Sequence, residues 1–471
     1  MPSEDVLTHL SAVELSTLLQ RKQVSPTEVL EAHLNAIAKV NPLLNAFVTL
    51  APEEARTAAK AAEAALLDGT AGQLAGIPVG IKDLTPTAGI RTTWGSTLFS
   101  DHVPVEDAEV VKRLKAAGAV IVGKTNTPEF GTGGNTYNAV FGATRNPWNA
   151  ALSASGSTGG GASALASRMV PLAEGTDFGG SLRTPAAFCG VVGLRTTSGL
   201  VPKHPATLPW HDQSVEGPMA RTAEDCALLL DAMTGLSRTT PLSTPVPWES
   251  ALSVVSGQRD LAGLRVAYVA DIAGIGIDDG IARSCREAAL GLRAAGAIIE
   301  ETVFDLSAFR EAFITLRGES MVGNHLARLD KLDQLGANLR GNIELGLDVS
   351  IMDIARAEHL RAEIWHRWRQ LFDRYDVLLT PTVPVEPFPV EQNYPAMING
   401  KPLATYIDWV AQTFLVSLAA LPAASVPSGL TAAGLPIGLQ VVGPRFSEPQ
   451  LLSVCKFVEQ AHPLGLPPNH A

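Results

Sequence analysis

A glycine-rich stretch over residues 153–198 constrains this chain more than any other part of its sequence. Glycine has no Cβ atom, so a ligand can approach the main chain and the backbone can adopt dihedral angles closed to other residues. Two serines of the stretch, Ser157 and Ser181, stand beside glycines. Apolar runs such as 188–194 separate the glycines, whereas a flexible linker would be polar. The stretch therefore predicts an ordered loop with exposed backbone N–H groups and two hydroxyls, or, as the alternative, a purely structural turn.

A lysine in an apolar setting lies upstream of this stretch. Residues 79–81 are typical of a short buried strand after Pro78, and Lys82 stands at its end. A lysine at such a position usually extends its charged end into solvent. If it is buried instead, its pKa falls because the charged form loses its hydration, and a neutral amine is a general base. Lys82 is therefore a candidate base, with a surface residue as the alternative.

Three motifs together carry a family resemblance. They are Gly-Ile-Pro-Val-Gly-Ile-Lys-Asp at 76–83, Gly-Ser-Thr-Gly-Gly at 156–160 and Gly-Thr-Asp-Phe-Gly-Gly-Ser at 175–181. This set resembles the signature of the amidase signature family of serine hydrolases, and the similarity continues through 216–221 and 434–440. The resemblance implies one amidase signature domain over 1–471. Its fold would be α/β, a large mixed twisted sheet flanked by helices on both faces.

The resemblance also implies a Ser-cisSer-Lys triad. Ser181 would be the nucleophile, and Ser157 would be the bridging serine, preceded by a cis peptide bond after Gly156. Lys82 would be the base that receives the proton of Ser181 through the hydroxyl of Ser157. These roles are those of nucleophile, base and orienting group in other hydrolases, filled by different residue types.

Further residues acquire roles from the same resemblance. Asp177 and Arg183 would support the turn before the nucleophile, with an ordinary ion pair as the alternative. The oxyanion hole would consist of backbone N–H groups, and one such donor contributes roughly 3 to 4 kcal/mol to the stabilisation of a tetrahedral intermediate. The four expected donors are those of Phe178, Gly179, Gly180 and Ser181.

Three further residues near the expected triad are two departures from the family pattern and one candidate substrate contact. Thr158 and Gly161 stand where many members of the family have serines. Thr158 keeps a hydroxyl and Gly161 loses one, so we expect looser support around the triad without loss of the chemistry. Gly131 lies in a loop, and the resemblance makes it a substrate contact, with a plain turn as the alternative.

Composition excludes several classes of partner. A net charge of −11 argues against nucleic acid, whose phosphates require a basic surface, and favours a small-molecule substrate. The chain has no phosphate-binding loop and no dinucleotide fingerprint. Its ten histidines show no ligand spacing. We therefore expect neither a cofactor nor a metal ion.

The cysteines and the apolar runs bear on location. The four cysteines lie far apart and without redox or metal spacing, which predicts reduced core residues: Cys189, Cys226, Cys285 and Cys455. The chain begins with an acidic segment that does not resemble a signal peptide. Pro422 interrupts the longest apolar run, so we expect no membrane span and a cytoplasmic protein.

The chain divides into three parts by pattern. Residues 1–70 are expected to be a helical arm that covers the core or a partner in a possible homodimer, and 76–200 alternate strand and helix as the catalytic core. Residues 250–375, mostly helical from 308 to 373, are expected to form the variable wall of the pocket. Residues 415–427 are expected to return to the sheet as a strand.

These expectations define one function and two alternatives. The expected enzyme is an amidase that hydrolyses a small or aryl carboxylic amide through an acyl-enzyme on Ser181, with possible action on esters and carbamates. The first alternative is the glutaminase-type subunit of an amidotransferase. The second is a non-catalytic scaffold that keeps the fold, although a scaffold has no use for Lys82, Ser157 and Ser181 together.

Overall fold

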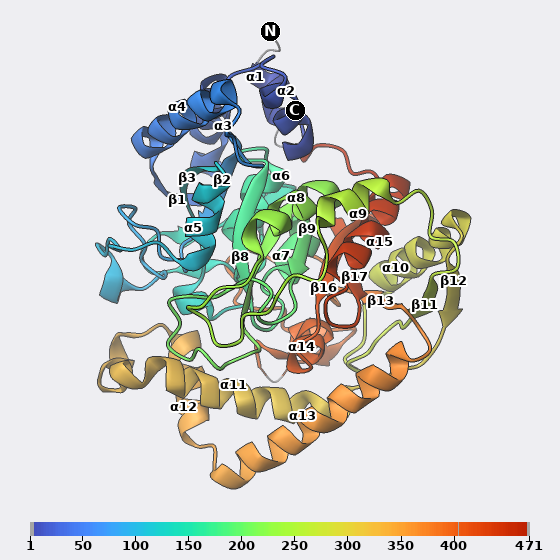
Figure 1. The fold of residues 1–471 in the computed structure, drawn as a ribbon. Helices are drawn as coiled ribbons and strands as arrows, with labels where there is room; N and C mark the ends of the chain where they lie inside the picture. Colours follow the sequence, from blue (N-terminus) through green and yellow to red (C-terminus); the bar gives the residue numbers. More distant parts are fainter. Residues whose placement is uncertain (1–3, 404, 469–471) are drawn as a thin grey trace.

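A mixed sheet of 11 strands runs through the molecule in the computed structural model, which describes residues 4–403 and 405–468 (Figure 1). Neighbouring strands are antiparallel through the middle of the sheet and parallel on either side of it, except for the first edge strand, which is antiparallel to its neighbour. The fold class expected from the sequence is thus confirmed. In spatial order the strands are β1 (Phe47–Leu50), β3 (Val120–Thr125), β2 (Pro78–Lys82), β8 (Leu172–Asp177), β10 (Val215–Ala220), β9 (Val192–Arg195), β16 (Ala423–Leu430), β17 (Pro436–Val442), β13 (Val377–Pro381), β11 (Arg265–Tyr268) and β12 (Ile298–Glu301).

Helices cover both faces of this sheet because its strands are apolar on both sides. Val79 and Ile121 belong to one core cluster, while Val120 and Val122 belong to another, as expected for side chains that alternate along a strand. The first cluster lies under α5 (Glu109–Ala116), α8 (Ala223–Met233), α9 (Ala251–Gly257), α10 (Asp279–Gly291) and α15 (Glu448–Ala461). The second lies under α6 (Gly159–Ala166), with α7 (Arg183–Cys189) beside it.

The N-terminal arm is helical with one exception. Ser11 and Ser25 form capping boxes at the N-caps of the second and third helices. The exception is β1, which pairs with β3 at the edge of the sheet. A strand of four residues between two strong helices gives too short a pattern to detect. The helices are α1 (Glu4–His9), α2 (Ala12–Gln20), α3 (Pro26–Leu44) and α4 (Pro52–Asp68).

Three long helices lie together outside the sheet, in the lower part of Figure 1. They are α11 (Arg310–His325), α12 (Ala337–Leu347) and α13 (Ile351–Phe372), as the helical pattern of 308–373 predicted. The expectation of a strand over 415–427 is partly wrong, because α14 (Ala411–Leu418) extends into it and β16 starts at Ala423. Every residue of α14 is buried, so no exposed face gives the sequence a helical period that distinguishes it from a strand.

The remaining elements are short. In the described part of the chain, three two-stranded hairpins lie outside the main sheet: β4 (Tyr137–Asn138) with β5 (Gly142–Ala143), β6 (Arg145–Asn146) with β7 (Asn149–Ser153), and β14 (Met397–Ile398) with β15 (Lys401–Pro402). The 3-10 helices are η1 (Thr97–Phe99), η2 (Glu129–Gly131), η3 (Leu292–Ala295), η4 (Ser307–Phe309), η5 (Leu326–Gln334) and η6 (Asp408–Val410).

The four cysteines are buried and unpaired, as the sequence predicted. Within the part of the chain that the structure describes, no helix combines the length and the apolar character that a membrane span requires.

The topology of the sheet brings the predicted site residues together. Strands β2 and β8 are parallel neighbours, so their carboxyl ends lie at the same edge of the sheet. Lys82 is the last residue of β2, and Asp177 is the last residue of β8. Ser157 precedes α6, and Ser181 lies in the turn between β8 and α7. The predicted site therefore assembles at the edge formed by β2 and β8.

Candidate active site

Lys82 is fully buried at the end of β2. Its Nζ lies 2.8 Å from Ser157 Oγ, 2.7 Å from Thr158 Oγ1 and 2.9 Å from Thr176 Oγ1. Three hydroxyls thus surround the amine, and no carboxylate forms an ion pair with it among residues 4–403 and 405–468. The alternative of a surface lysine is wrong.

This environment changes the acidity of the amine. The pKa of Lys82 is lowered to about 7, mainly by burial; the carboxyls of Glu174 and Asp177 oppose this shift, and the charge of Lys203 contributes to it. A lysine with this pKa is substantially neutral near pH 7. The amine can therefore accept a proton from a neighbouring hydroxyl at neutral pH.

Ser157 lies at the start of the segment that leads into α6, and the Gly156–Ser157 peptide bond is cis. Glycine is required before it, because a Cβ atom on residue 156 would lie 2.7 Å from the carbonyl oxygen of Gly133. The hydroxyl of Ser157 reaches the cavity on one side and Lys82 on the other. Lys82 does not line the cavity itself. Ser157 therefore stands between the buried amine and the cavity.

Thr158 supports the amine directly. Its hydroxyl accepts a hydrogen bond from Lys82 and donates one to the carbonyl of Thr176 at 3.3 Å. Its methyl carbon lies 3.2 Å from the position that a Cβ atom on Gly161 would take. The two departures from the family pattern are thus spatial neighbours, since the methyl group of Thr158 occupies the space beside Gly161.

Ser181 lies in the turn between β8 and α7, half-buried at the edge of the cavity. Gly180 before it has φ of 131°, a conformation that L-residues rarely adopt, and a Cβ atom there would lie 2.2 Å from Thr413 Oγ1. The carbonyl of Ser181 accepts a hydrogen bond from the N–H of Thr158 at 3.2 Å. This bond joins the two serine-bearing segments. The hydroxyl of Ser181 itself has no hydrogen-bond partner among the described residues.

The four expected oxyanion donors are not equivalent. The N–H of Gly180 donates to the carboxylate of Asp177 at 3.0 Å, so it is already engaged within the turn. The N–H groups of Gly179 and Ser181 have no acceptor among the described residues, and both residues line the cavity together with Phe178. Two backbone donors beside Ser181 are therefore available to a negatively charged oxygen.

Asp177 and Arg183 form a buried network and not an ordinary surface ion pair. Arg183 Nη2 lies 2.9 Å from Asp177 Oδ1, and Arg195 Nη1 lies 3.2 Å from the same oxygen, with all three side chains inaccessible to solvent. Burial alone would raise the pKa of Asp177, but the two guanidinium groups hold it well below its usual range. The same carboxylate accepts from the N–H of Leu182 at 3.1 Å. Asp177 thereby fixes the turn that carries Ser181.

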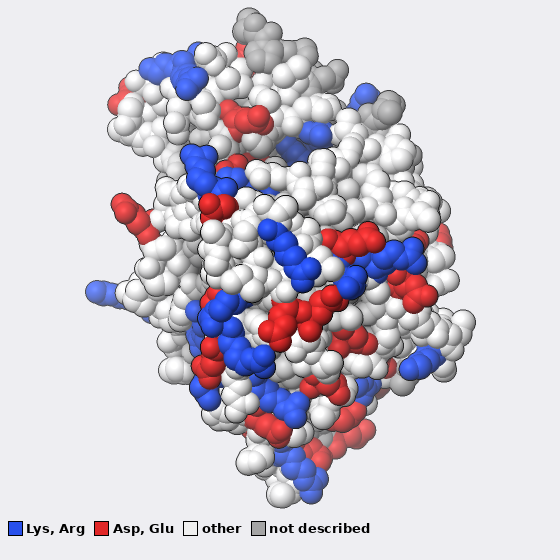
Figure 2. Space-filling model, turned by 90° about the vertical axis from the view of Figure 1, so that its right-hand side faces the viewer, with Lys and Arg blue, Asp and Glu red and all other residues white. Residues whose placement is uncertain are grey.

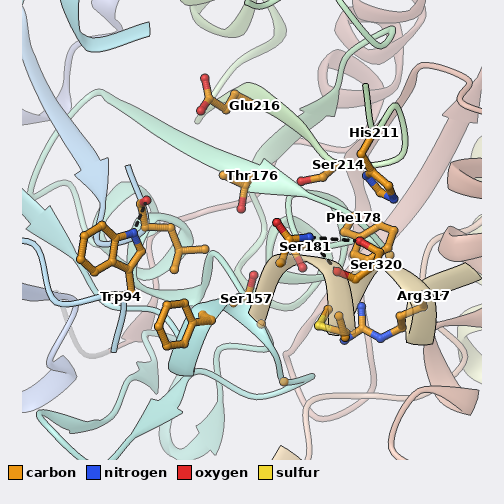
Figure 3. Close-up of a pocket in the computed structure, with 18 of the residues that line it drawn as sticks. Trp94, Ser157, Thr176, Phe178, Ser181, His211, Ser214, Glu216, Arg317 and Ser320 are labelled. Atoms are coloured by element: carbon orange, nitrogen blue, oxygen red, sulfur yellow. Dashed lines mark hydrogen bonds between the residues drawn. The ribbon is translucent and has the colours of Figure 1, made fainter. Parts of the chain in front are cut away.

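A cavity of about 360 Å³ opens over the two serines (Figure 3). Gly131 lies beside the hydroxyl of Ser157: a Cβ atom on residue 131 would be 3.4 Å from Ser157 Oγ. The structure thus brings most of the predicted residues to the cavity wall, namely Gly131, Ser157, Phe178, Gly179, Gly180 and Ser181. It places the other four behind that wall: Lys82, Thr158, Asp177 and Arg183.

Aromatic side chains form one side of this cavity. The rings of Trp94 and Phe130 are nearly parallel, with centroids 6.5 Å apart, and His325 meets Phe130 edge to face at 4.8 Å. Both Trp94 and Phe130 have left-handed backbone conformations, with φ of 52° and 47°. Hydrogen bonds maintain them, from Trp94 N–H to Asp83 O and from Phe130 N–H to Trp94 O. The wall is suited to a planar apolar group.

Sequence reasoning missed several polar residues of the site. Glu174 and Thr176 lie two residues apart on β8, and both bond to Lys82, one at its N–H and the other at its Nζ. The alternation of β8 beside the end of a parallel strand could have identified this pair. Lys203 and Glu216 line the cavity from further along the chain; Glu216 begins the stretch 216–221 of the family resemblance, which gave it no role, and no motif includes Lys203.

Comparisons with known proteins agree with this geometry. The family model described as Amidase matches residues 28–452. A glutamyl-tRNA(Gln) amidotransferase subunit from Methylococcus capsulatus is 36% identical over 477 residues, covering 95% of this chain and 96% of that protein. An acylamidase from Rhodococcus erythropolis is 35% identical over 451 residues, covering 93% of this chain and 92% of that protein.

A solved structure gives the same result. The crystal structure of a bacterial aryl acylamidase of the amidase signature family matches with a TM-score of 0.89 and 29% identity, over 97% of this chain and 96% of that one. The match of the family model to most of the chain is supported by relatives that are similar along nearly their full lengths. The chain therefore belongs to the amidase signature family, whose members are hydrolases of carbon–nitrogen bonds other than peptide bonds.

Proposed function

We propose that the protein is an amidase that hydrolyses a small or aryl carboxylic amide through an acyl-enzyme on Ser181. One observation carries this proposal. The buried amine of Lys82, with its lowered pKa, lies 2.8 Å from Ser157 Oγ, and Ser157 shares the cavity with Ser181. A base, a bridging hydroxyl and a nucleophile are thus arranged in that order from the interior to the cavity.

Acylation uses these groups in sequence. The oxygen of Ser181 attacks the amide carbon while its proton passes to Ser157, whose own proton passes to the neutral amine of Lys82. The negative charge that develops on the carbonyl oxygen is stabilised by the N–H groups of Gly179 and Ser181. The carbon–nitrogen bond then breaks, and the proton returns from Lys82 through Ser157 to the departing amine. The products of this step are the free amine and the ester on Ser181.

Deacylation repeats the relay with water. A water molecule gives a proton to Lys82 through Ser157 and attacks the ester carbon. The second tetrahedral intermediate releases the carboxylic acid, and the oxygen of Ser181 regains a proton. An ester or a carbamate passes through a similar tetrahedral oxyanion, so the same site would act on activated members of both classes.

The wall formed by Trp94 and Phe130 supports an aryl group in the substrate. In Figure 3, Trp94 lies on one side of Ser157 and Ser181, while Phe178 and His211 lie on the other. The ring of Phe130 is nearly parallel to that of Trp94 and adds to its flat apolar surface. The similarity to an acylamidase and to an aryl acylamidase supports the same substrate class.

A second candidate is the glutaminase-type subunit of an amidotransferase. The 36% identity to a subunit of glutamyl-tRNA(Gln) amidotransferase favours it, because this identity extends over 95% of the chain. The same triad would hydrolyse the side-chain amide of glutamine. Ammonia release from L-glutamine, compared with amine release from anilides, distinguishes the two candidates.

A small molecule is the proposed partner. On the face drawn in Figure 2, basic and acidic side chains are interspersed, without a broad basic area of the kind that nucleic acid requires. We also propose a cytoplasmic location, which the four unpaired buried cysteines support. Homodimer formation remains part of the proposal and is measured by light scattering.

The test measures amine release from anilides, aliphatic amides, aryl carbamates and L-glutamine. Ser181→Ala and Lys82→Ala should each lose activity by a factor of roughly 1,000 or more on the best substrate. The matched control is Ser253→Ala, which removes an exposed hydroxyl on α9 that does not line the cavity. It should stay within roughly threefold of the wild type.

Covalent labelling separates an enzyme from a scaffold. A fluorophosphonate should modify Ser181, as located by mass spectrometry, and modification should be slow in Lys82→Ala. Activity that survives in both Ser181→Ala and Lys82→Ala would refute the mechanism. The absence of both an adduct and any hydrolysis would favour the scaffold.

A further inference from the structure

Arg317 on α11 has an unusual environment for a buried charge. The residue is 7% exposed and lines the cavity that contains Ser181. Its Nε donates to Asn342 Oδ1 at 3.0 Å, and its Nη2 donates to the hydroxyl of Tyr406 at 2.9 Å. Its guanidinium carbon lies 5.3 Å from the ring centroid of Phe178. All of these partners are neutral.

Arg317 has no negatively charged partner among the residues that the structure describes. Buried charges in proteins are normally paired, because an uncompensated charge in the interior costs several kcal/mol. Arg183 follows this rule, with Asp177 at 2.9 Å. Arg317 forms no ion pair with any carboxylate in residues 4–403 and 405–468, and its Nη1 has no acceptor there. A guanidinium offers five N–H donors in a planar fork, so several donors remain unused.

The rest of the cavity adds positive charge. Arg328 also lines it, beside the rings of Phe99 and Phe130, without a carboxylate partner among the described residues. Lys203 is a third cation of the lining, and Glu216 is the one carboxyl group among the lining residues that the structure describes. The chain as a whole carries a net charge of −11. An acidic protein thus contains a cavity with an excess of basic groups.

We propose that Arg317 binds a carboxylate of the substrate, so that the amide hydrolysed belongs to a molecule with a free carboxylate elsewhere. A carboxylate accepts two parallel N–H donors from a guanidinium and would supply the missing counter-charge. The position is suitable, because Phe178, on which Arg317 stacks, begins the turn that leads to Ser181. Figure 3 shows Arg317 and Ser320 of α11 on the same side of the cavity as Phe178.

This inference rests on the proposed amide hydrolysis at Ser181 and specifies its substrate class. The carboxylate can belong to the acyl part or to the amine part of the substrate, so both arms are tested. Glutaric mono-anilide is compared with hexananilide for the acyl part, and 4-acetamidobenzoate with 4-acetamidotoluene for the amine part. In each pair the charged group replaces a neutral one on otherwise similar molecules.

In the wild type, kcat/KM should be at least tenfold higher for the charged member of one pair. Arg317→Gln should reduce kcat/KM for that substrate by roughly 10- to 100-fold, mainly through a higher KM, since a charge-assisted hydrogen bond is lost. The neutral member should change less than threefold. Arg317→Lys should keep part of the preference. The control Arg356→Gln removes an equal charge from an exposed side chain of α13 and should leave both substrates unchanged.

A binding measurement keeps the inference independent of turnover. Calorimetry of Ser181→Ala with succinate, glutarate and adipate should detect binding of at least one dicarboxylate, which Arg317→Gln in the same background should abolish.

If the neutral anilide is cleaved and neither the charged substrates nor the dicarboxylates depend on Arg317, the anion site is wrong and the hydrolase stands. If a dicarboxylate binds through Arg317 and no amide is cleaved, the anion site stands and the proposed hydrolysis is wrong. The inference would be overturned if Arg317→Gln reduced kcat/KM equally for charged and neutral substrates. It would also be overturned if the protein bound no dicarboxylate and the wild type did not prefer the charged substrates.

Discussion

The amine nitrogen of Lys82 lies 2.8 Å from the hydroxyl oxygen of Ser157, and solvent reaches the lysine nowhere. The cavity can therefore exchange protons with this amine through Ser157, whose hydroxyl faces both. The pKa of Lys82 and the position of Thr158 are then the properties that determine whether the relay operates.

Activity should depend on the protonation of Lys82. Burial lowers its pKa to about 7, and only the neutral amine can accept a proton. The pH profile of kcat/KM, which reports the free enzyme, should rise about tenfold per pH unit below 7 and level off above it. Measuring the rate of fluorophosphonate labelling gives the same profile without a titrating substrate. A flat profile between about pH 5.5 and 8 would show that another group is the base.

The space shared by Thr158 and Gly161 should be measurable by a double-mutant cycle. Gly161→Ser places an atom 3.2 Å from the methyl carbon of Thr158, so it should displace the Lys82 acceptor and lower kcat by roughly tenfold. Thr158→Ser keeps the hydroxyl and should stay near the wild type. The two changes together should restore most of the activity, because the methyl group is gone. Additive effects of the two changes would argue against this coupling.

Removing the charge of Asp177 should destabilise the fold. Asp177→Asn leaves Arg183 and Arg195 buried without their counter-charge, at a cost of about 3 to 5 kcal/mol. Chemical denaturation should show this loss in the free energy of unfolding. The control Asp376→Asn breaks a partly exposed pair with Arg265 and should cost about 1 kcal/mol or less. Similar effects of both changes would contradict the assigned role of the buried network.

Glu216 should make the stability of the fold depend on pH. Burial first, and then the neighbouring Glu174, raise the pKa of Glu216 to about 8 from a usual value of 4.5, against the charge of Lys203. The folded protein therefore holds this proton to a higher pH than the unfolded chain does. The resulting stabilisation is complete below about pH 4.5 and is lost as the pH rises toward 8.

Glu216→Gln removes this dependence. Its melting temperature relative to the wild type should thus be higher at pH 8 than at pH 5, by an amount that corresponds to at least about 1 kcal/mol. Thermal unfolding at the two pH values tests this, with Glu391→Gln on the surface as the control. An equal difference at both pH values would show that Glu216 keeps an ordinary pKa when folded.

Much of the site could be predicted from sequence because glycine patterns report local backbone geometry. The segments around Ser157 and Ser181 each need glycine for close approach, at Gly156 and Gly180, and these requirements are visible in the chain. The burial of Lys82 could be predicted from its position at the end of an apolar strand together with the family resemblance. The resemblance favoured a buried base over a lysine at the surface.

The rest depends on contacts between distant segments. Glu216 acquires its high pKa from burial beside Glu174, which is 42 positions earlier in the chain (216 − 174), and no local pattern encodes that proximity. The sequence indicated that residues 308–373 contribute to the pocket wall, but not which of their side chains line it. The contact between Arg317 and Phe178 depends on the orientation of α11, which no local pattern gives. The helix α14 was not predicted because complete burial removes the period that identifies a helix.

The two sides of the cavity come from different parts of the chain. All three hydroxyls around Lys82 belong to residues 157–176, whereas Arg317 and Ser320 belong to α11, which packs outside the sheet. Natural variation in α11 can therefore alter which molecules are accepted while the proton relay is inherited unchanged. Relatives that keep Lys82, Ser157 and Ser181 but have an apolar residue in place of Arg317 should hydrolyse uncharged amides by the same step. The residue at this position would then distinguish members of the family by the charge of their substrates.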